Sequence, residues 1–111
     1  MAQSTDDLGA VLARLEATIA ARKNAAPHTS YTASLLDGGT QKCAKKFGEE
    51  AVEAVLAAVS RDKGHLTQEA ADVLYHLLVM LAAADVCLDD VAAVLSSREG
   101  TSGHDEKARR H

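Results

Sequence analysis

Two acidic clusters lie inside two long runs of strong helix formers, and their spacing limits how the chain can fold. The first run covers residues 41–60, the second covers residues 68–84, and a short polar turn separates them. Because a helix has 3.6 residues per turn, carboxylates three or four positions apart share one face. A turn this short makes the two helices antiparallel neighbours, so both acidic faces can line one space. The acids are Glu49, Glu50, Glu53, Glu69 and Asp72.

Apolar positions border both clusters, and we expect their side chains in the core. They are Val52, Val55, Leu56, Val59, Val73, Leu74, Leu77 and Leu78. An unpaired buried carboxylate is strongly destabilising, so acids in this setting must be neutralised by a cation or protonated. Oxygen ligands favour hard ions, which predicts Mg²⁺, with Mn²⁺ as a substitute. A solvated acidic face is the alternative for the first cluster alone, but the second cluster, set in an apolar helix, favours the metal site.

Three lysines precede the first acidic cluster on the same predicted helix. They are Lys42, Lys45 and Lys46. Lys42 and Lys46 fall on the arc that carries Glu49, so positive charge would lie beside the metal, where a polyphosphate needs both. An ion pair between Lys46 and Glu49 or Glu50 is the purely structural alternative. The sequence contains no GxxxxGK[ST] motif, so phosphate binding falls to the metal and the lysines.

Three hydroxyl side chains follow the only proline, at the start of a short predicted helix. They are Ser30, Tyr31 and Thr32. The N–H groups at a helix start can bind phosphate, whereas a plain N-cap is the structural alternative for Ser30. Gly38 and Gly39 end this helix, and glycines at such a place also let a ligand approach the backbone. Thr40 is the expected cap of the next helix.

Hydrophobic patterning predicts an all-α fold for residues 1–111 as a single domain. The run from Leu77 to Ala84 is apolar nearly all round, so other helices must cover it on several sides. The chain has too few further helices to do so. We therefore expect a bundle of about four to five helices that a homodimer or larger assembly completes. From Ser97 onward the apolar pattern is lost, which predicts a charged, mobile tail over residues 97–111.

Overall charge and the cysteines restrict the partners and the compartment. The net charge of −4 and the pI near 5.7 argue against nucleic acid as a partner. The longest apolar run is too short to span a bilayer, and the first residues lack the pattern of a signal peptide. Cys43 and Cys87 lie far apart without a CxxC pair, as in proteins of a reducing compartment. We expect a cytoplasmic protein that contacts neither membranes nor nucleic acids.

Four stretches together resemble a known family. They are Ser30–Leu36, the pattern Lys46-x-Gly48-Glu49-Glu50-x-x-Glu53, Glu69–Leu78, and Gly100–Gly103 leading into Glu106-Lys107. The acidic patterns are similar to those of the all-α, MazG-like nucleoside triphosphate pyrophosphohydrolases. The first and last stretches narrow the resemblance to the phosphoribosyl-ATP pyrophosphatase family, which acts in the second step of histidine biosynthesis. The resemblance implies hydrolysis of the α–β phosphoanhydride of phosphoribosyl-ATP to phosphoribosyl-AMP and pyrophosphate.

The predicted roles divide into metal binding, catalysis and substrate binding. Glu50, Glu53, Glu69 and Asp72 are the expected Mg²⁺ ligands, and Glu49 is the expected group that orients or deprotonates water. An exchange of roles between Glu49 and Glu50 stays open. For the three hydroxyl residues at 30–32 and for the tail, the resemblance implies contacts with the nucleotide or its phosphates. The expected substrate-binding residues are Ser30, Tyr31, Thr32, Gly38, Gly39, Lys42, Lys45, Lys46, His76, Ser102 and Lys107.

Two other functions remain open from the sequence. Within the enzyme class, the chain could be a house-cleaning pyrophosphohydrolase that acts on ordinary or damaged nucleotides. From a different class, it could be a non-catalytic helical dimerisation or metal-binding module, whose acids only bind cations or a basic partner. No Ser-His-Asp arrangement occurs, which argues against a covalent intermediate.

Overall fold

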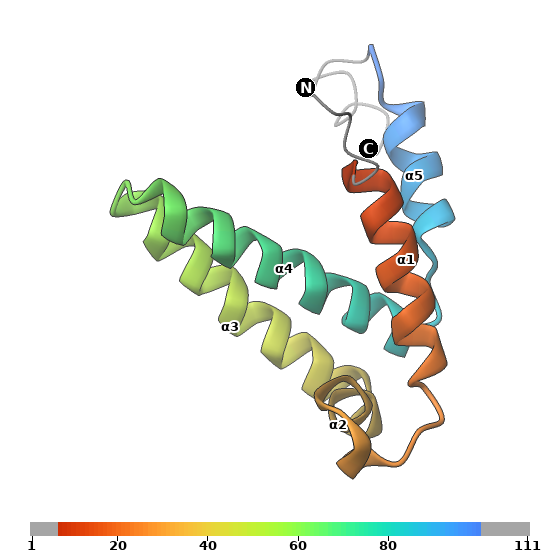
Figure 1. Ribbon diagram of the computed structural model, residues 1–111. Coiled ribbons are helices and arrows are strands. Elements are labelled where there is room, and N and C mark those ends of the chain that lie inside the picture. Colours follow the sequence, from red (N-terminus) through yellow and green to blue (C-terminus); the bar gives the residue numbers. More distant parts are fainter. Residues whose placement is uncertain (1–6, 101–111) are drawn as a thin grey trace, which may run out of the picture.

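The computed structural model describes residues 7–100, and this part of the chain is helical, with no strand. The all-α prediction is confirmed. Figure 1 shows that two long helices run antiparallel and extend away from the remaining ones, with the turn between them at the far tip. The elements are α1 (Leu8–Ala21), a 3₁₀ turn (Pro27–Thr29), α2 (Tyr31–Asp37), α3 (Gly39–Val59), α4 (Lys63–Ala83) and α5 (Leu88–Ser97).

The α3–α4 hairpin is the element that positions the acidic residues. Its turn is shorter than expected, because α4 begins at Lys63 and not near residue 68. The Asp62 side chain caps α4 by accepting a hydrogen bond from the His65 backbone N–H at 3.0 Å. Arg61 turns the chain with a φ of 62°. The extra turn of helix brings His65 in line with Glu69, one turn further along α4.

A side-chain cap begins α2, whereas a glycine begins α3. Ser30 caps α2, accepting a hydrogen bond from the Ala33 N–H at 3.0 Å, so the N-cap interpretation is confirmed. Gly39 begins α3 with a φ of 78°, a left-handed conformation that favours glycine. Thr40 therefore does not cap α3. Its hydroxyl donates instead to the carbonyl oxygen of Ala83 at the end of α4, at 3.3 Å.

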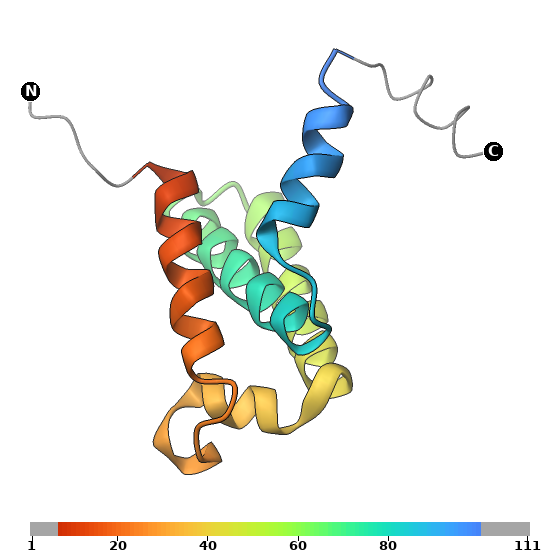
Figure 2. The same cartoon turned by 90° about the vertical axis from the view of Figure 1, so that its right-hand side faces the viewer.

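The core lies at the inner end of the hairpin, where α1 and α2 cover α4. Its fully buried members are Ile19, Leu35, Cys43, Leu78 and Val79. Figure 2 shows α1 and α5 on two sides of α4, with α2 at the start of α3. The ammonium group of Lys23 binds the carbonyl oxygen of Ala82 and the carboxylate of Asp85, which ties the end of α1 to the end of α4. None of the described helices is long and apolar enough to cross a bilayer.

Four apolar side chains of α3 lie outside this core, which corrects the prediction for them. Val52, Val55, Leu56 and Val59 are between 57% and 75% exposed. At about 100° per residue they lie on the face of α3 opposite to buried Cys43 and Ala57, which face the rest of the chain. We call these four residues the α3 stripe. Of the corresponding residues of α4, Leu78 lies in the core as predicted, whereas Val73, Leu74 and Leu77 are only partly buried and do not belong to the core cluster.

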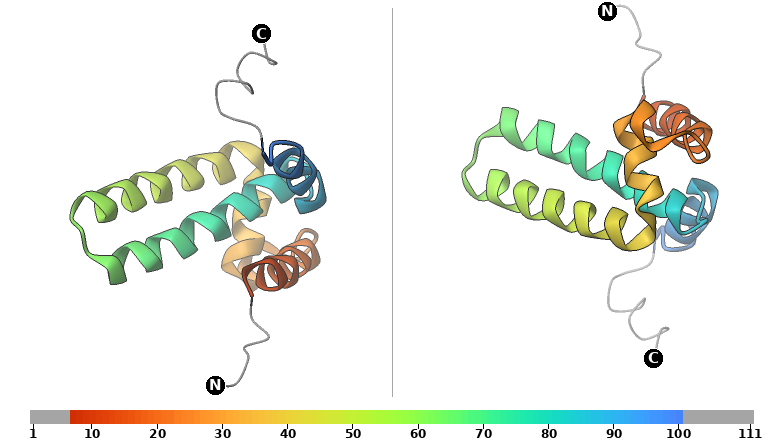
Figure 3. Two further views of the ribbon diagram at one scale, coloured as in Figure 1. Left: turned by 90° about the horizontal axis from the view of Figure 1, so that it is seen from above. Right: turned by 90° about the horizontal axis from the view of Figure 1, so that it is seen from below.

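Helix α5 lies beside the inner end of the hairpin and has no buried residue. It begins at Leu88, where the Asp90 carboxylate accepts a hydrogen bond from the Cys87 backbone N–H at 3.3 Å. Figure 3 shows α1 and α5 on either side of the C-terminal end of α4, whereas the outer half of the hairpin carries no other helix. Within one described chain, that outer half is therefore uncovered.

The two cysteines differ in accessibility, which gives a simple test of the fold. Cys43 is 1% exposed, its thiol donates to the Leu35 carbonyl oxygen, and burial raises its pKa; Cys87 is exposed. The rate of thiol–disulfide exchange depends on the thiolate fraction and on the solvent exposure of the sulfur. We therefore expect a disulfide reagent such as dithionitrobenzoate to label one thiol per native chain and both thiols after denaturation. The variant Cys87→Ser should abolish native labelling. Rapid native labelling of that variant would contradict the packing of α2 on α3.

Candidate metal centre and nucleotide site

Three of the predicted metal ligands converge where α3 faces α4. Glu50, Glu69 and Asp72 each offer a carboxylate oxygen, and these oxygens lie within 4.8 Å of one another. The Oε2 atom of Glu69 is buried without a hydrogen-bond partner. Like charges held this close repel one another, and a buried carboxylate oxygen needs a positive partner. An all-oxygen donor set with one orphaned oxygen fits a hard divalent cation such as Mg²⁺ or Mn²⁺.

The other two acids of α3 lie differently. Glu53 is exposed and is not part of the 4.8 Å group among the described residues. Glu49 accepts an ion pair from Lys46, with 3.1 Å between Nζ and Oε1. The hydrogen bond to Glu49 raises the pKa of Lys46, so this lysine stays charged. The ion pair that was the structural alternative for Lys46 therefore forms with Glu49, the residue next to the predicted metal ligand Glu50.

No role for His65 is predicted from the sequence, but the structure brings this residue to the acidic group. Its Nε2 atom lies 3.4 Å from Oε1 of Glu69, so a protonated His65 forms an ion pair with one of the three clustered carboxylates. The available signal was the spacing of four residues to Glu69 on one helix. It was missed because α4 was expected to start after His65.

An aromatic and hydroxyl cluster joins the start of α2 to α4. The hydroxyl of Tyr31 lies 3.1 Å from Nε2 of His76, and the Thr32 hydroxyl is hydrogen bonded to the Tyr75 hydroxyl. The Nδ1 atom of His76 lies 2.8 Å from the backbone oxygen of Asp72. Burial raises the pKa of Tyr31, and the positive charge of Lys46 opposes this shift. Two of the predicted hydroxyl residues, Tyr31 and Thr32, are therefore linked to the part of α4 that carries the predicted metal ligand Asp72.

These acidic and aromatic residues lie within the part of the chain that matches a known protein family. A family model described as phosphoribosyl-ATP pyrophosphohydrolase matches residues 12–99. The chain belongs to this family. The match spans every described residue of the acidic and aromatic groups, and the resemblance inferred from sequence is confirmed.

Named relatives agree with the family match. A phosphoribosyl-ATP pyrophosphatase of Dinoroseobacter shibae is 68% identical over 100 residues, which covers 90% of this chain and 98% of the relative. A protein of the same name from Rhodobacter capsulatus is 63% identical over 89% of this chain and 96% of its own length. The corresponding protein of Paracoccus denitrificans is 64% identical, with 89% and 92% covered. The chain is thus similar to these pyrophosphatases along nearly its whole length.

Only some of the other predicted substrate-binding residues of this pyrophosphohydrolase-family chain lie near the acidic residues. Lys42 reaches the Ser34 carbonyl oxygen at 3.5 Å, so it leans toward α2. A Cβ atom on Gly38 would lie 2.8 Å from Cβ of Lys42, so this glycine makes room for the lysine. Lys45 is exposed on α3. Ser102 and Lys107 lie outside the described residues, so the predicted role of the tail stays a prediction.

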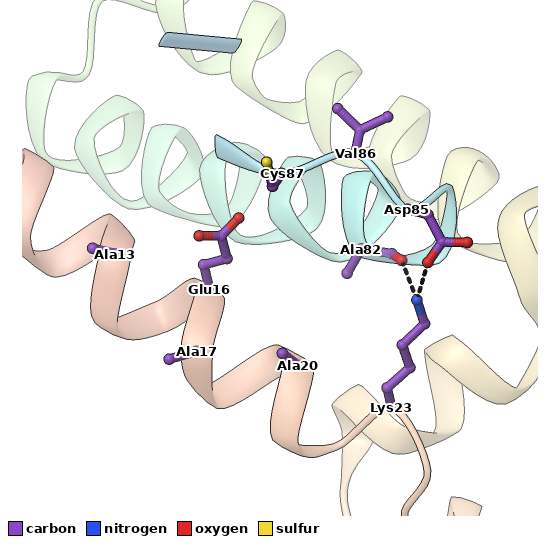
Figure 4. Close-up of a pocket in the computed structure, with 9 residues that line it drawn as sticks. All are labelled: Ala13, Glu16, Ala17, Ala20, Lys23, Ala82, Asp85, Val86 and Cys87. Carbon is purple, nitrogen blue, oxygen red and sulfur yellow. Dashed lines mark hydrogen bonds and ion pairs between the residues drawn. The ribbon is translucent and has the colours of Figure 1, made fainter. Parts of the chain in front are cut away.

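Two hollows of the described surface lie away from the acids of this family member. One, of about 430 Å³, lies between α1 and the α4–α5 connection, where Glu16, Lys23 and Asp85 line it (Figure 4). In it, the Glu16 carboxylate accepts a hydrogen bond from the Leu88 backbone N–H at 2.7 Å. The second, of about 420 Å³, lies among α1, α4 and α5 and is mainly apolar. Both belong to helix packing, and we assign the chemistry to the open acidic surface because its donor set fits a cation.

Proposed function

We propose that this chain hydrolyses phosphoribosyl-ATP to phosphoribosyl-AMP and pyrophosphate in histidine biosynthesis, using a divalent cation held by Glu50, Glu69 and Asp72. The observation that carries the proposal is the convergence of these three carboxylates, with one buried oxygen unpaired, in a chain of the phosphoribosyl-ATP pyrophosphohydrolase family. When bound, Mg²⁺ supplies charge neutralisation for phosphate oxygens and polarises the attacked phosphoryl group. We also propose that the protein acts in the cytoplasm, which supplies nucleotides.

The positions of Glu49 and Glu50 support different roles for them in this proposal. Glu50 belongs to the three-carboxylate group, which suits a metal ligand. Glu49 lies outside that group and is held by an ion pair with Lys46, which suits a group that orients the attacking water or accepts a proton from it. Lys46, charged and adjacent, offsets negative charge on the departing pyrophosphate. Glu53, one turn beyond Glu50, joins the group as a fourth ligand through a change of rotamer.

We further propose that the active form is a homodimer, with a second copy on the α3 stripe. Burying a Val or Leu side chain contributes about 1.5–3 kcal/mol, so four such residues left 57–75% exposed are a strong drive to associate. The stripe continues to Gly48, one turn before Val52, where a Cβ atom added to the glycine would meet no other atom within 4 Å. That open space rules out tight crossing by a helix of the same described chain, and a second copy can use it.

The acids border the α3 stripe, so the proposed dimer also shapes the site. Counting about 100° per residue along α3, Glu49 and Glu53 point between the stripe and the face that packs on α4. A second copy on the stripe would therefore form a wall beside them. This explains why the acidic group of a single described chain lies on an open surface and lines neither of the two hollows.

The test of the function is pyrophosphate release from phosphoribosyl-ATP with Mg²⁺ and with EDTA, beside ATP and a panel of deoxynucleoside triphosphates. We expect release only from phosphoribosyl-ATP, with loss of activity in EDTA and recovery when Mg²⁺ or Mn²⁺ is restored. Release from the panel instead would indicate a house-cleaning pyrophosphohydrolase. A folded protein that releases pyrophosphate from none of these compounds would be a binding module.

A further inference from the structure

The exposed ring of Tyr31 is held from two sides. Its ring and that of Tyr75 are nearly parallel, with an interplanar angle of 23° and centroids 6.3 Å apart. The imidazole of His76 meets both rings edge-on, at centroid distances of 6.0 Å from Tyr31 and 4.9 Å from Tyr75. Tyr31 is 53% exposed, whereas His76 is 5% exposed. The chain thus presents one aromatic ring to solvent against a rigid aromatic support.

The hydrogen bonds of His76 determine how the Tyr31 hydroxyl is oriented. A backbone carbonyl oxygen only accepts, so the 2.8 Å contact with Asp72 requires the proton on Nδ1. In the neutral ring Nε2 then has a free lone pair, and it accepts a hydrogen bond from the Tyr31 hydroxyl at 3.1 Å. Both ring nitrogens of His76 are therefore used within the chain. His76 is placed to position Tyr31, and a direct substrate contact through these nitrogens would break one of the two bonds.

A second link fixes the same part of α2. The hydroxyl of Thr32 is hydrogen bonded to that of Tyr75, so two adjacent residues of α2 are joined to two adjacent residues of α4. Tyr75 and His76 follow Asp72 by three and four residues on the same helix. Hence the orientation of the Tyr31 ring is coupled to the turn of α4 that carries a proposed metal ligand.

Tyr31 also lies near Lys46 and the proposed metal site. The charges of Lys46, Glu50 and Glu49 all act on its hydroxyl. A nucleotide whose phosphates lie at these residues can place its base on the free face of the ring. Aromatic side chains bind bases by stacking, because every base has a π-face.

We propose that Tyr31 stacks on the adenine ring of the substrate, and that Tyr75 and His76 are positioning residues that hold Tyr31 for this purpose. The inference rests on the proposed function and names the part of phosphoribosyl-ATP that Tyr31 recognises. It gives His76 a positioning role in place of the direct substrate contact expected from the sequence. It also gives a role to Tyr75, which the sequence pattern left as a packing residue.

Tyrosine fluorescence tests the stacking directly. The sequence has two tyrosines and no tryptophan, so all intrinsic emission comes from the Tyr31–Tyr75 pair. With Mg²⁺ present, we expect AMP to quench this emission saturably after correction for absorbed light, and ribose 5-phosphate and pyrophosphate to leave it unchanged. Equal quenching by ribose 5-phosphate would overturn the proposal, as would AMP that competes with the substrate in the assay without quenching.

Kinetics of matched variants separate stacking from structure. We expect Tyr31→Leu to raise KM for phosphoribosyl-ATP by about ten- to a hundredfold while kcat changes by less than about threefold. Tyr31→Phe keeps the ring and should stay within about threefold of the parent KM. A fall in kcat alone for Tyr31→Leu would overturn the stacking role. Failure of the function itself is distinguishable, since the unchanged protein would then release no pyrophosphate.

The positioning role of His76 has its own comparison. His76→Leu should raise KM, and His76→Gln, whose side-chain oxygen can accept from the Tyr31 hydroxyl, should recover most of the loss. If His76 acts through Tyr31, the double variant Tyr31→Leu/His76→Leu should have the KM of Tyr31→Leu alone. Additive effects, or no recovery by Gln, would overturn it. Circular dichroism should show that each variant retains its helices, so that a change in KM is not caused by unfolding.

Discussion

Replacing Asp72 by Asn is expected to lower kcat/KM for phosphoribosyl-ATP by about a hundredfold or more, because a metal ion contributes several kcal/mol of transition-state stabilisation. The substitution keeps the size of the side chain and removes one of the three negative charges of the proposed metal centre. Activity should be measured over a range of Mg²⁺ concentrations, since weakened metal binding shifts the dependence to higher concentration. Helical content should be unchanged, because Asp72 is exposed.

Metal binding by the folded chain is measured separately from turnover. A ligand that binds only the native state raises the melting temperature, so Mg²⁺ should stabilise the parent protein relative to EDTA. It should leave the melting temperature of Asp72→Asn nearly unchanged. The matched control is Asp89→Asn, an exposed aspartate of α5 outside the acidic group, which should retain both activity and the Mg²⁺ response. An Asp72→Asn enzyme with parental activity would exclude the proposed centre.

Glu53→Gln then decides whether the fourth predicted ligand takes part. If Glu53 joins the group when Mg²⁺ binds, its substitution should resemble Asp72→Asn. If it stays exposed, the variant should resemble the Asp89→Asn control.

Replacing Val55 by Glu is expected to convert the protein from a dimer to a chain of 11.6 kDa, as measured by light scattering after size-exclusion chromatography. Val55 is 60% exposed at the centre of the α3 stripe. In a two-fold interface the same residue occurs on both copies, so the change buries two carboxylates close together. We expect the dissociation constant to rise by about a hundredfold or more, since burying a charge without a partner costs several kcal/mol.

The matched control is Leu8→Glu, which places the same charge on an apolar residue that is 61% exposed at the start of α1. This variant should remain dimeric. At concentrations where the Val55→Glu variant is monomeric, its activity per chain should fall, because the proposed second copy forms one side of the acidic site. A parent protein that is monomeric at micromolar concentration, or a Val55→Glu variant that stays dimeric, would contradict the interface.

Local features of the fold could be predicted because their causes are local. The helical periodicity places acids three and four residues apart on one face, and Ser30 caps α2 through its own side chain. The start of α4 was misplaced because residues 63–67 are mostly polar and carry little apolar signal. Its real signal was a cap, the bond from the His65 N–H to Asp62. Thr40 was misread as a cap because a left-handed glycine had already begun the helix.

The division of the acids shows where periodicity is insufficient. Glu49 and Glu50 are neighbours in sequence, yet one pairs with Lys46 and the other faces Glu69 and Asp72. A rotation of about 100° per residue separates them, and only the position of α4 decides which one reaches the cluster. The α3 helix has apolar residues on two faces, so the pattern alone could not tell which face packs on α4.

By itself, the sequence determined the helical class, the resemblance to the pyrophosphohydrolase family and the set of acids that includes the three of the proposed metal centre. These follow from residue type and helical spacing, which act over a few residues. Only the tertiary structure decided which acids meet, which apolar face of α3 is left outside, and that Tyr31 and His76, 45 residues apart, form a hydrogen bond. The physical reason is that such contacts depend on how two helices are rotated about their axes, and packing of the whole chain sets that rotation.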